Sequence, residues 1–194
     1  MFFWLFCLAI VAIVVVAFSV LNQNRSNSTP SNLPSSPAER SIFDLQIGDI
    51  VQHGGIDWVV EDCLTYNQSG FIWQEYLLQD GTRRAWLAVE EDDWVEVQLV
   101  EPITTVDISA NPTKELTVDD VIYRCVESGT ASMTRKRNRT QSGVQTCQFF
   151  DYEGPNDKVL SVENWEGDIE VCMGDRISPS SITILPGDGE SVYR

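Results

Sequence analysis

The sequence is poor in positive charge. It has 13 Lys and Arg residues against 29 Asp and Glu residues in a chain of 194, which gives a formal net charge of -16. A protein that binds nucleic acid neutralises phosphates with a basic surface, and this balance argues against such a surface. We therefore expect no nucleic-acid partner.

Residues that build common catalytic and metal centres are also scarce. The chain has one histidine, His53, and its five cysteines form no CxxC pair. Structural zinc needs clustered Cys and His ligands, and the hydrolase motifs GxSxG and HExxH do not occur. The run Glu90–Asp93 lacks the alternating Asp and Asn ligands of a calcium loop and is typical of a solvated turn. The sequence thus predicts no metal site, no cofactor and no catalytic residue set.

A sustained helical period is missing after residue 40, and two-residue alternation takes its place. In residues 85–90 and 94–99, small or branched apolar side chains at odd positions alternate, apart from Ala88, with larger or more polar ones at even positions. Strands with one buried face show this alternation. Gly54-Gly55 between two short apolar runs predicts a tight hairpin turn. The expected fold class is all-β, with two related antiparallel meander sheets that form a sandwich or a barrel-like body.

The two halves of this body, about 45–101 and 115–186, resemble each other. The matching segments are 87–90 with 160–163, 95–97 with 169–171, and Trp73-Gln74 with Cys147-Gln148. Inward and outward faces agree along the last two strands of each copy, which a chance match would not guarantee. We interpret the match as an internal pseudo-repeat. The alternative is that two unrelated meanders with tight turns look alike.

The N-terminal segment is long and apolar. Residues 2–21 carry no charge and no helix breaker, and about 20 apolar residues span a bilayer core of roughly 30 Å. We predict a transmembrane helix here, with a cleaved signal peptide as the alternative. Arg25 and Arg40 follow the segment and no basic residue precedes it, which favours a single-pass membrane protein with a cytoplasmic body.

The remaining boundaries follow from composition. Residues 22–40 are rich in Ser, Asn and Pro and have little to bury, so they predict a linker. We expect the globular domain at residues 41–186 and a frayed tail at 187–194. The four cysteines of the body show no disulfide spacing, and free thiols are expected.

Several short motifs resemble a known bacterial family. They are Leu45-Gln46-Ile47-Gly48-Asp49, Trp73-Gln74-Glu75-Tyr76-Leu77, Trp86-Leu87, Leu160 to Gly167 (LSVENWEG) and Met173-Gly174-Asp175. In this combination the chain is similar, over roughly residues 45–186, to the family catalogued as domain of unknown function 4178. The resemblance implies a bacterial protein, in a family often coupled to membrane-associated systems, and it supplies no catalytic residues.

Carboxylates and tryptophans recur at matching positions of the two halves. Along residues 71–77, Glu75 shares a face with apolar side chains, and a Glu follows Leu-x-Val in both copies. Indole faces attract cations and stack on flat apolar surfaces, so these residues could line a pocket for a cationic or sugar-like ligand. The candidate pocket residues are Trp73, Glu75, Trp86, Glu90, Glu163 and Trp165. The alternative places Glu75 on a sheet edge and the tryptophans in a core between sheets.

One basic run interrupts the acidic body. Residues 133–143 are predicted to form a protruding loop that carries Arg135, Lys136, Arg137 and Arg139. These side chains could contact anionic lipid if the body lies near a membrane. An ordinary solvated loop is the alternative.

The sequence favours a membrane-anchored, non-enzymatic β-rich module that binds a ligand or an unidentified protein partner. The alternative is a carboxylate-based hydrolase or lyase with a site near Glu75, Glu90 and Glu163. That alternative requires at least two of these carboxylates to converge in one cleft, where their pKa values would be driven apart.

Overall fold

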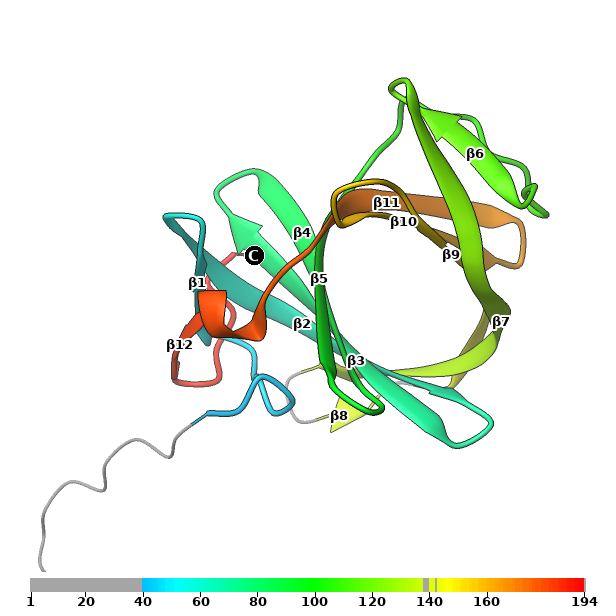
Figure 1. The fold of residues 1–194 in the computed structure, drawn as a ribbon. Coiled ribbons are helices and arrows are strands. Elements are labelled where there is room, and N and C mark those ends of the chain that lie inside the picture. Colours follow the sequence, from blue (N-terminus) through cyan, green and yellow to red (C-terminus); the bar gives the residue numbers. More distant parts are fainter. Residues whose placement is uncertain (1–39, 138–139, 142, 194) are drawn as a thin grey trace, which may run out of the picture. The chain divides into compact units, whose positions relative to one another are not determined.

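The structure is a computed structural model, and it describes residues 40–137, 140–141 and 143–193. These residues form one antiparallel sheet of twelve strands (Figure 1). The strands are β1 (Ile50–His53), β2 (Ile56–Gln68), β3 (Phe71–Asp80), β4 (Arg83–Glu91), β5 (Val95–Pro102), β6 (Glu115–Val118), β7 (Val121–Arg137), β8 (Thr140–Gln141), β9 (Gln145–Glu153), β10 (Lys158–Trp165), β11 (Asp168–Arg176) and β12 (Thr183–Leu185).

Eight of the strands close into a barrel. Their order is β2-β3-β4-β5-β11-β10-β9-β7, and pairing of β7 with β2 completes the ring, which Figure 1 shows end-on. The prediction of an all-β fold is confirmed, and of the two arrangements considered, the barrel is right and the sandwich is wrong. Closure leaves β3 without a free edge, so Glu75 does not lie on a sheet edge.

Each half of the chain supplies four consecutive barrel strands, β2 to β5 and then β7, β9, β10 and β11. The strand register refines the predicted correspondence between the halves. Gln74 lies opposite Val89, and Phe150 lies opposite Val162, the counterpart of Val89. Trp73 therefore corresponds to Phe149, two residues beyond the predicted Cys147, and Glu75 corresponds to Asp151.

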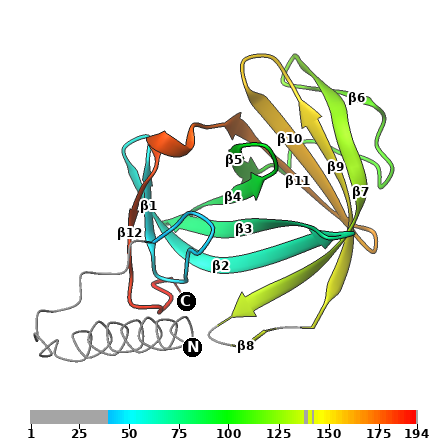
Figure 2. The same ribbon diagram turned by 60° about the horizontal axis from the view of Figure 1, so that its bottom comes forward.

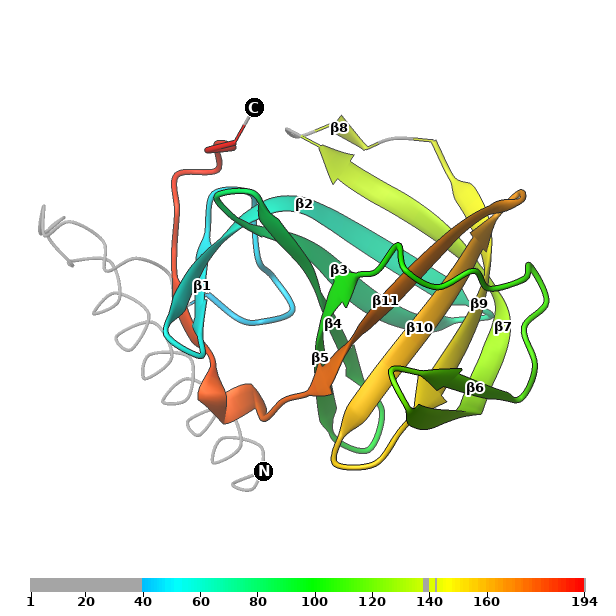
Figure 3. The same cartoon turned by 90° about the horizontal axis from the view of Figure 1, so that it is seen from above.

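Additional segments cover the outside of the barrel on opposite flanks (Figures 2 and 3). On one flank β1, β12 and residues 42–47 pack on the outward side chains of β3, β4 and β5, with Trp58 and Leu87 fully buried between them. On the other flank β6 and the segment before it pack on β7, β9, β10 and β11 around Tyr123 and Tyr152. With the outward faces covered, the barrel strands are buried on both sides.

Local turns largely follow the sequence. Gly54 and Gly55 take φ values of +59° and +79°, as the predicted β1–β2 hairpin requires. The strand after it is longer than expected, because β2 runs to Gln68 and the turn is confined to Ser69-Gly70.

The basic segment begins as a strand and not as a loop, which corrects the prediction for residues 133–137. Met133 to Arg137 continue β7, and this extension pairs with β2 to close the barrel. Arg135 lies opposite Leu64 and forms an ion pair with Asp62 at 3.1 Å between Nε and Oδ2, whereas Lys136 lies opposite Cys63 and is exposed.

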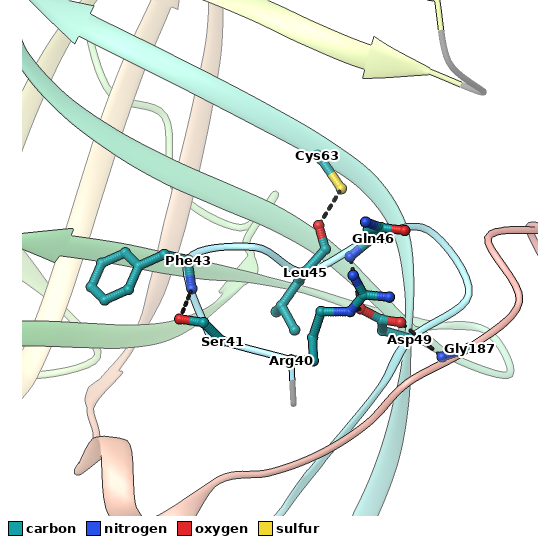
Figure 4. A network of polar contacts seen from close by, with 8 residues as sticks. All are labelled: Arg40, Ser41, Phe43, Leu45, Gln46, Asp49, Cys63 and Gly187. Atoms are coloured by element: carbon teal, nitrogen blue, oxygen red, sulfur yellow. Dashed lines mark hydrogen bonds and ion pairs between the residues drawn. The ribbon is translucent and has the colours of Figure 1, made fainter. Parts of the chain in front are cut away.

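The C-terminal segment, predicted to be a frayed tail, contacts the rest of the domain. Asp49 is fully buried and accepts hydrogen bonds from the backbone N–H groups of Gln46 and Gly187, at 2.8 Å each, while pairing with Arg40 at 2.9 Å (Figure 4). Glu61 accepts the backbone N–H groups of residues 192 and 193. Two buried or half-buried carboxylates thus fix the ends of the domain to β1 and β2.

The predicted transmembrane helix (residues 2–21) and all of the predicted linker (22–40) except Arg40 lie outside the described residues, so they stay predictions. Within the described part of the chain, no helix is long and apolar enough to span a membrane.

Candidate functional site

The inward faces of the barrel strands enclose a cavity of about 230 Å³. Alternation along each strand decides which side chains reach it: on β3 these are Phe71, Trp73 and Glu75, because successive residues point to opposite faces. The other inward side chains that the argument uses are Trp86 and Glu90 on β4, Glu96 on β5, Phe149, Asp151 and Glu153 on β9, Glu163 on β10, Glu170 and Arg176 on β11, and Glu127 on β7.

Aromatic rings gather around Tyr66 at the inner part of this lumen. The Tyr66 ring stacks on Trp73, with ring centroids 4.9 Å apart and planes 10° from parallel, and Trp165 approaches it at 6.3 Å. Phe149 meets the other side of Trp73 edge-on at 5.5 Å. Tyr66 is fully buried, so this cluster is held rigidly by packing.

Two carboxylates are anchored to this aromatic cluster. Trp73 Nε1 donates to Glu75 Oε1 at 3.1 Å, and Trp165 Nε1 donates to Glu163 Oε2 at 3.2 Å. The Tyr66 hydroxyl interacts with both carboxylates and, with its single O–H, can donate to one of them at a time. Glu75 and Glu163, from opposite halves of the chain, therefore converge on one phenol group.

Burial changes the titration of these groups. Loss of hydration, followed by the charge of Glu163, raises the pKa of Glu75 well above its ordinary value, and loss of hydration also raises the pKa of Glu163. The same cause raises the pKa of Tyr66. At least one of the two carboxyls therefore holds a proton near neutral pH, because two adjacent buried carboxylates repel each other.

Asp151 has a different environment from Glu75 and Glu163. It lines the lumen and is half-buried, and no hydrogen bond or ion pair reaches it from any residue that the structure describes. Burial first, and then the charges of Glu163, Glu127, Glu90 and Glu96, raise its pKa to about 8. Asp151 is thus an inward-facing acid without a partner.

The lumen has an excess of acid. Eight carboxyl groups line the cavity, and the one cationic side chain among its described lining residues is Arg176. That guanidinium is already engaged, since its Nε lies 2.7 Å from Glu96 and its terminal nitrogen 2.6 Å from Glu153. No group of three or more His, Cys, Asp or Glu within the described ranges is arranged to hold a metal ion.

Sequence comparison places this arrangement in a family. The family described as domain of unknown function (DUF4178) matches residues 46–179, which contain all eight barrel strands. The chain belongs to the DUF4178 family. The resemblance inferred from its motifs was therefore right. The DUF4178 barrel described here is the fold of that matched region.

Relatives of the chain occur in mycobacteria. Uncharacterised proteins of Mycobacterium bovis and Mycobacterium tuberculosis are 29% identical over 198 residues, covering 92% of this chain and 92% of each relative. No solved structure gives a significant match.

The DUF4178 barrel brings together the residues that the sequence singled out. Trp73, Glu75, Trp86, Glu90 and Glu163 line the cavity, and Trp165 lies beside it through its hydrogen bond to Glu163. The tryptophans also form part of the inner core, as the alternative interpretation held. Whether a ligand binds among them stays a prediction.

The possible lipid contact does not form a common surface. Alternation along β7 turns Arg135 and Lys136 to opposite faces, and Arg139 lies outside the described residues, as does the side chain of Arg137. A lipid role for the four residues stays a prediction. Arg135 and Lys136 would then contact lipid from strand β7 and not from the loop that was expected.

Sequence reasoning missed Tyr66, Phe149 and Asp151. Tyr66 fell in a stretch read as a turn, and Asp151 was overlooked because the repeat was aligned two residues out of register. An alignment of the two halves that matches Phe149 with Trp73 also matches Asp151 with Glu75, and so places an acid at the same position of both halves.

Proposed function

We propose that this protein is a non-enzymatic binding module whose barrel lumen takes a small organic cation. The observation that carries the proposal is the imbalance of charge inside an aromatic-lined cavity, where eight carboxyls face one guanidinium that is already paired. A cation entering there would gain carboxylate contacts beside the indole rings of Trp73 and Trp86, which line the cavity.

The bound group should carry N–H donors. Glu75 and Glu163 each accept one indole N–H and share Tyr66, so each carboxylate keeps further lone pairs for a donor. A primary ammonium supplies three N–H groups, whereas a quaternary ammonium supplies none. The cavity volume of about 230 Å³ equals that of roughly eight water molecules at ~30 Å³ each. It therefore suits a ligand of about eight non-hydrogen atoms or fewer.

A carboxylate-based hydrolase is the second candidate, and one observation favours it: Glu75 and Glu163 do converge in one cavity, as that alternative required. The contacts of these groups weigh against it. Trp73, Trp165 and Tyr66 already engage the carboxylates that would have to act on a substrate bond. This supports a binding role more than a catalytic one.

The test is calorimetric titration of the full-length protein, in mild detergent, with three probes that share one alkyl chain: butylamine, 1-butanol and butyrate. We expect butylamine to bind with a Kd of roughly 0.1–1 mM, which suits so small a ligand, and the other two to bind far more weakly. Glu163→Gln should weaken butylamine about tenfold or more, because it removes a charge-assisted contact.

The matched control is Glu91→Gln, which removes an exposed carboxylate at the end of β4 and should leave binding unchanged. Equal affinity for butylamine and 1-butanol, or no binding of butylamine at all, would contradict a cation-binding lumen. Butylamine should be recovered unaltered.

A membrane tether, a cytoplasmic position of the barrel and a protein partner stay predictions from the sequence.

A further inference from the structure

The two halves of the lumen are related by the internal repeat, but they are not equally supplied with hydrogen-bond donors. Trp73 donates to Glu75 in the first half. At the corresponding position of the second half stands Phe149, whose ring has no N–H, so Asp151 receives no such bond. The second half of the lumen thus has the acid without the donor.

The same asymmetry affects the second pair of acids. Glu163 accepts the indole N–H of Trp165, whereas its counterpart Glu90 has Asp92 at the matching position. Loss of hydration and the charges of Glu96 and Glu127 raise the pKa of Glu90. The lumen therefore contains one acidic pair held by indole donors, Glu75 with Glu163, and one pair without them, Asp151 with Glu90.

We propose that the lumen binds a linear diamine, with one ammonium group between Glu75 and Glu163 and the other at Asp151. This proposal rests on the function proposed above and names the ligand class. Phe149 and Ser161 lie directly opposite Glu163 and Asp151 on the paired strands β9 and β10, so the two acids are diagonal neighbours on one face. Such neighbours lie about 7–8 Å apart, a gap that roughly four methylene groups span.

Asp151 is the decisive anchor. It is half-buried, it faces the cavity, and no described residue donates to it or pairs with it. Arg176 does not fill this role because Glu96 and Glu153 hold its guanidinium. An ammonium group of a ligand would supply the hydrogen bonds and the opposite charge that the protein does not.

Diamine binding should release protons and depend on pH. The charged groups that face Asp151 are Glu163 on β10, Glu127 on β7, Glu90 on β4 and Glu96 on β5, all acidic. Before the ligand enters, Asp151 retains its proton near neutral pH, because burial and these charges raise its pKa to about 8. An ammonium group displaces that proton as it binds. Affinity should therefore rise between about pH 6 and pH 9, while an alkyl ammonium with a pKa near ~10 stays charged.

The experiment compares 1,4-diaminobutane with butylamine on the full-length protein at pH 8. We expect the diamine to bind about tenfold or more tightly than butylamine, since it adds a second charge-assisted contact. Asp151→Asn should abolish that preference, so that the variant binds the diamine and butylamine with similar affinity. Glu91→Gln is the matched control and should preserve the preference.

The outcomes separate this inference from the proposed function. If butylamine binds but the diamine is no tighter, or if Asp151→Asn retains the preference, the diamine site is wrong and the cation-binding lumen stands. If neither amine binds the wild-type protein, both fail. Circular dichroism of each variant establishes that the barrel is folded, and Asp151→Asn removes an unpaired acid, so it should fold at least as well as the wild type.

Discussion

Replacing Asp151 by Asn should stabilise the protein, and the gain should grow as the pH rises. In the folded barrel, burial and the neighbouring charge of Glu163 raise the pKa of Asp151 to about 8, against an ordinary value of 3.8. The folded protein therefore holds a proton that the unfolded chain has released. The stability due to this group is fully present below about pH 4 and is lost as the pH rises through 8.

The pKa difference of about four units sets the size of the effect. At roughly 1.4 kcal/mol per unit, ionising Asp151 inside the barrel would cost at most about 5–6 kcal/mol. Water in a cavity of about 230 Å³ screens part of this cost. We expect Asp151→Asn to raise the free energy of unfolding at pH 9 by about 2–3 kcal/mol, which is roughly 4–12 °C in Tm for a domain of this size.

Thermal unfolding, followed by circular dichroism at pH 5, 7 and 9, measures this directly. The wild type should lose stability as the pH rises, and Asp151→Asn should lose less. Glu91→Gln, which removes an exposed acid, should follow the wild type. The reasoning is refuted if wild type and Asp151→Asn depend on pH in the same way, or if the variant is the less stable of the two at pH 9.

Two further substitutions test how the barrel is held together. Asp49→Asn should lower the free energy of unfolding, measured in urea, by about 2–4 kcal/mol, because a fully buried carboxylate loses its ion pair and part of its backbone hydrogen bonding. The control is Asp44→Asn at an exposed position, which should change this free energy by less than about 0.5 kcal/mol. Gly174→Ala should cost about 3 kcal/mol or prevent closure at the β5–β11 seam, because the new methyl would meet the carbonyl oxygen of Leu99 inside van der Waals distance. Gly143→Ala has open space around the new methyl and should unfold like the wild type; equal curves for the two glycine variants would contradict the steric argument.

The sequence predicted the strands of this fold better than their closure. Alternation located β3, β4, β5, β10 and β11 because each buries one kind of side chain on one face. Closure depends on β7 reaching β2, and the end of β7 is polar and basic, so residues 133–137 looked like a loop. Pairing between strands about 70 residues apart leaves no local signal. A sandwich and a barrel were therefore equally compatible with the pattern.

The residues of the candidate site also divide into those that the sequence predicted and those that it did not. Glu90 and Glu163 were identified because a Glu follows Leu-x-Val in both halves, and Glu75 because it shares a strand face with apolar side chains. Tyr66 and Arg176 could not be placed, because each has a partner in the other half of the chain, Glu163 for Tyr66 and Glu96 for Arg176. The raised pKa values also could not be predicted, since they arise from enclosure by eight strands rather than from any one of them.

The two halves of the chain place acids on both sides of the lumen, but only one side has indole donors. Position 73 is a Trp and position 149 is a Phe, so Asp151 is a half-buried carboxyl with a raised pKa and no partner among the described residues. Such a group costs free energy in the folded barrel. Under the diamine proposal a ligand ammonium group would supply the missing contact, and the free energy that Asp151→Asn returns to folding would be the free energy that the wild type keeps available for binding.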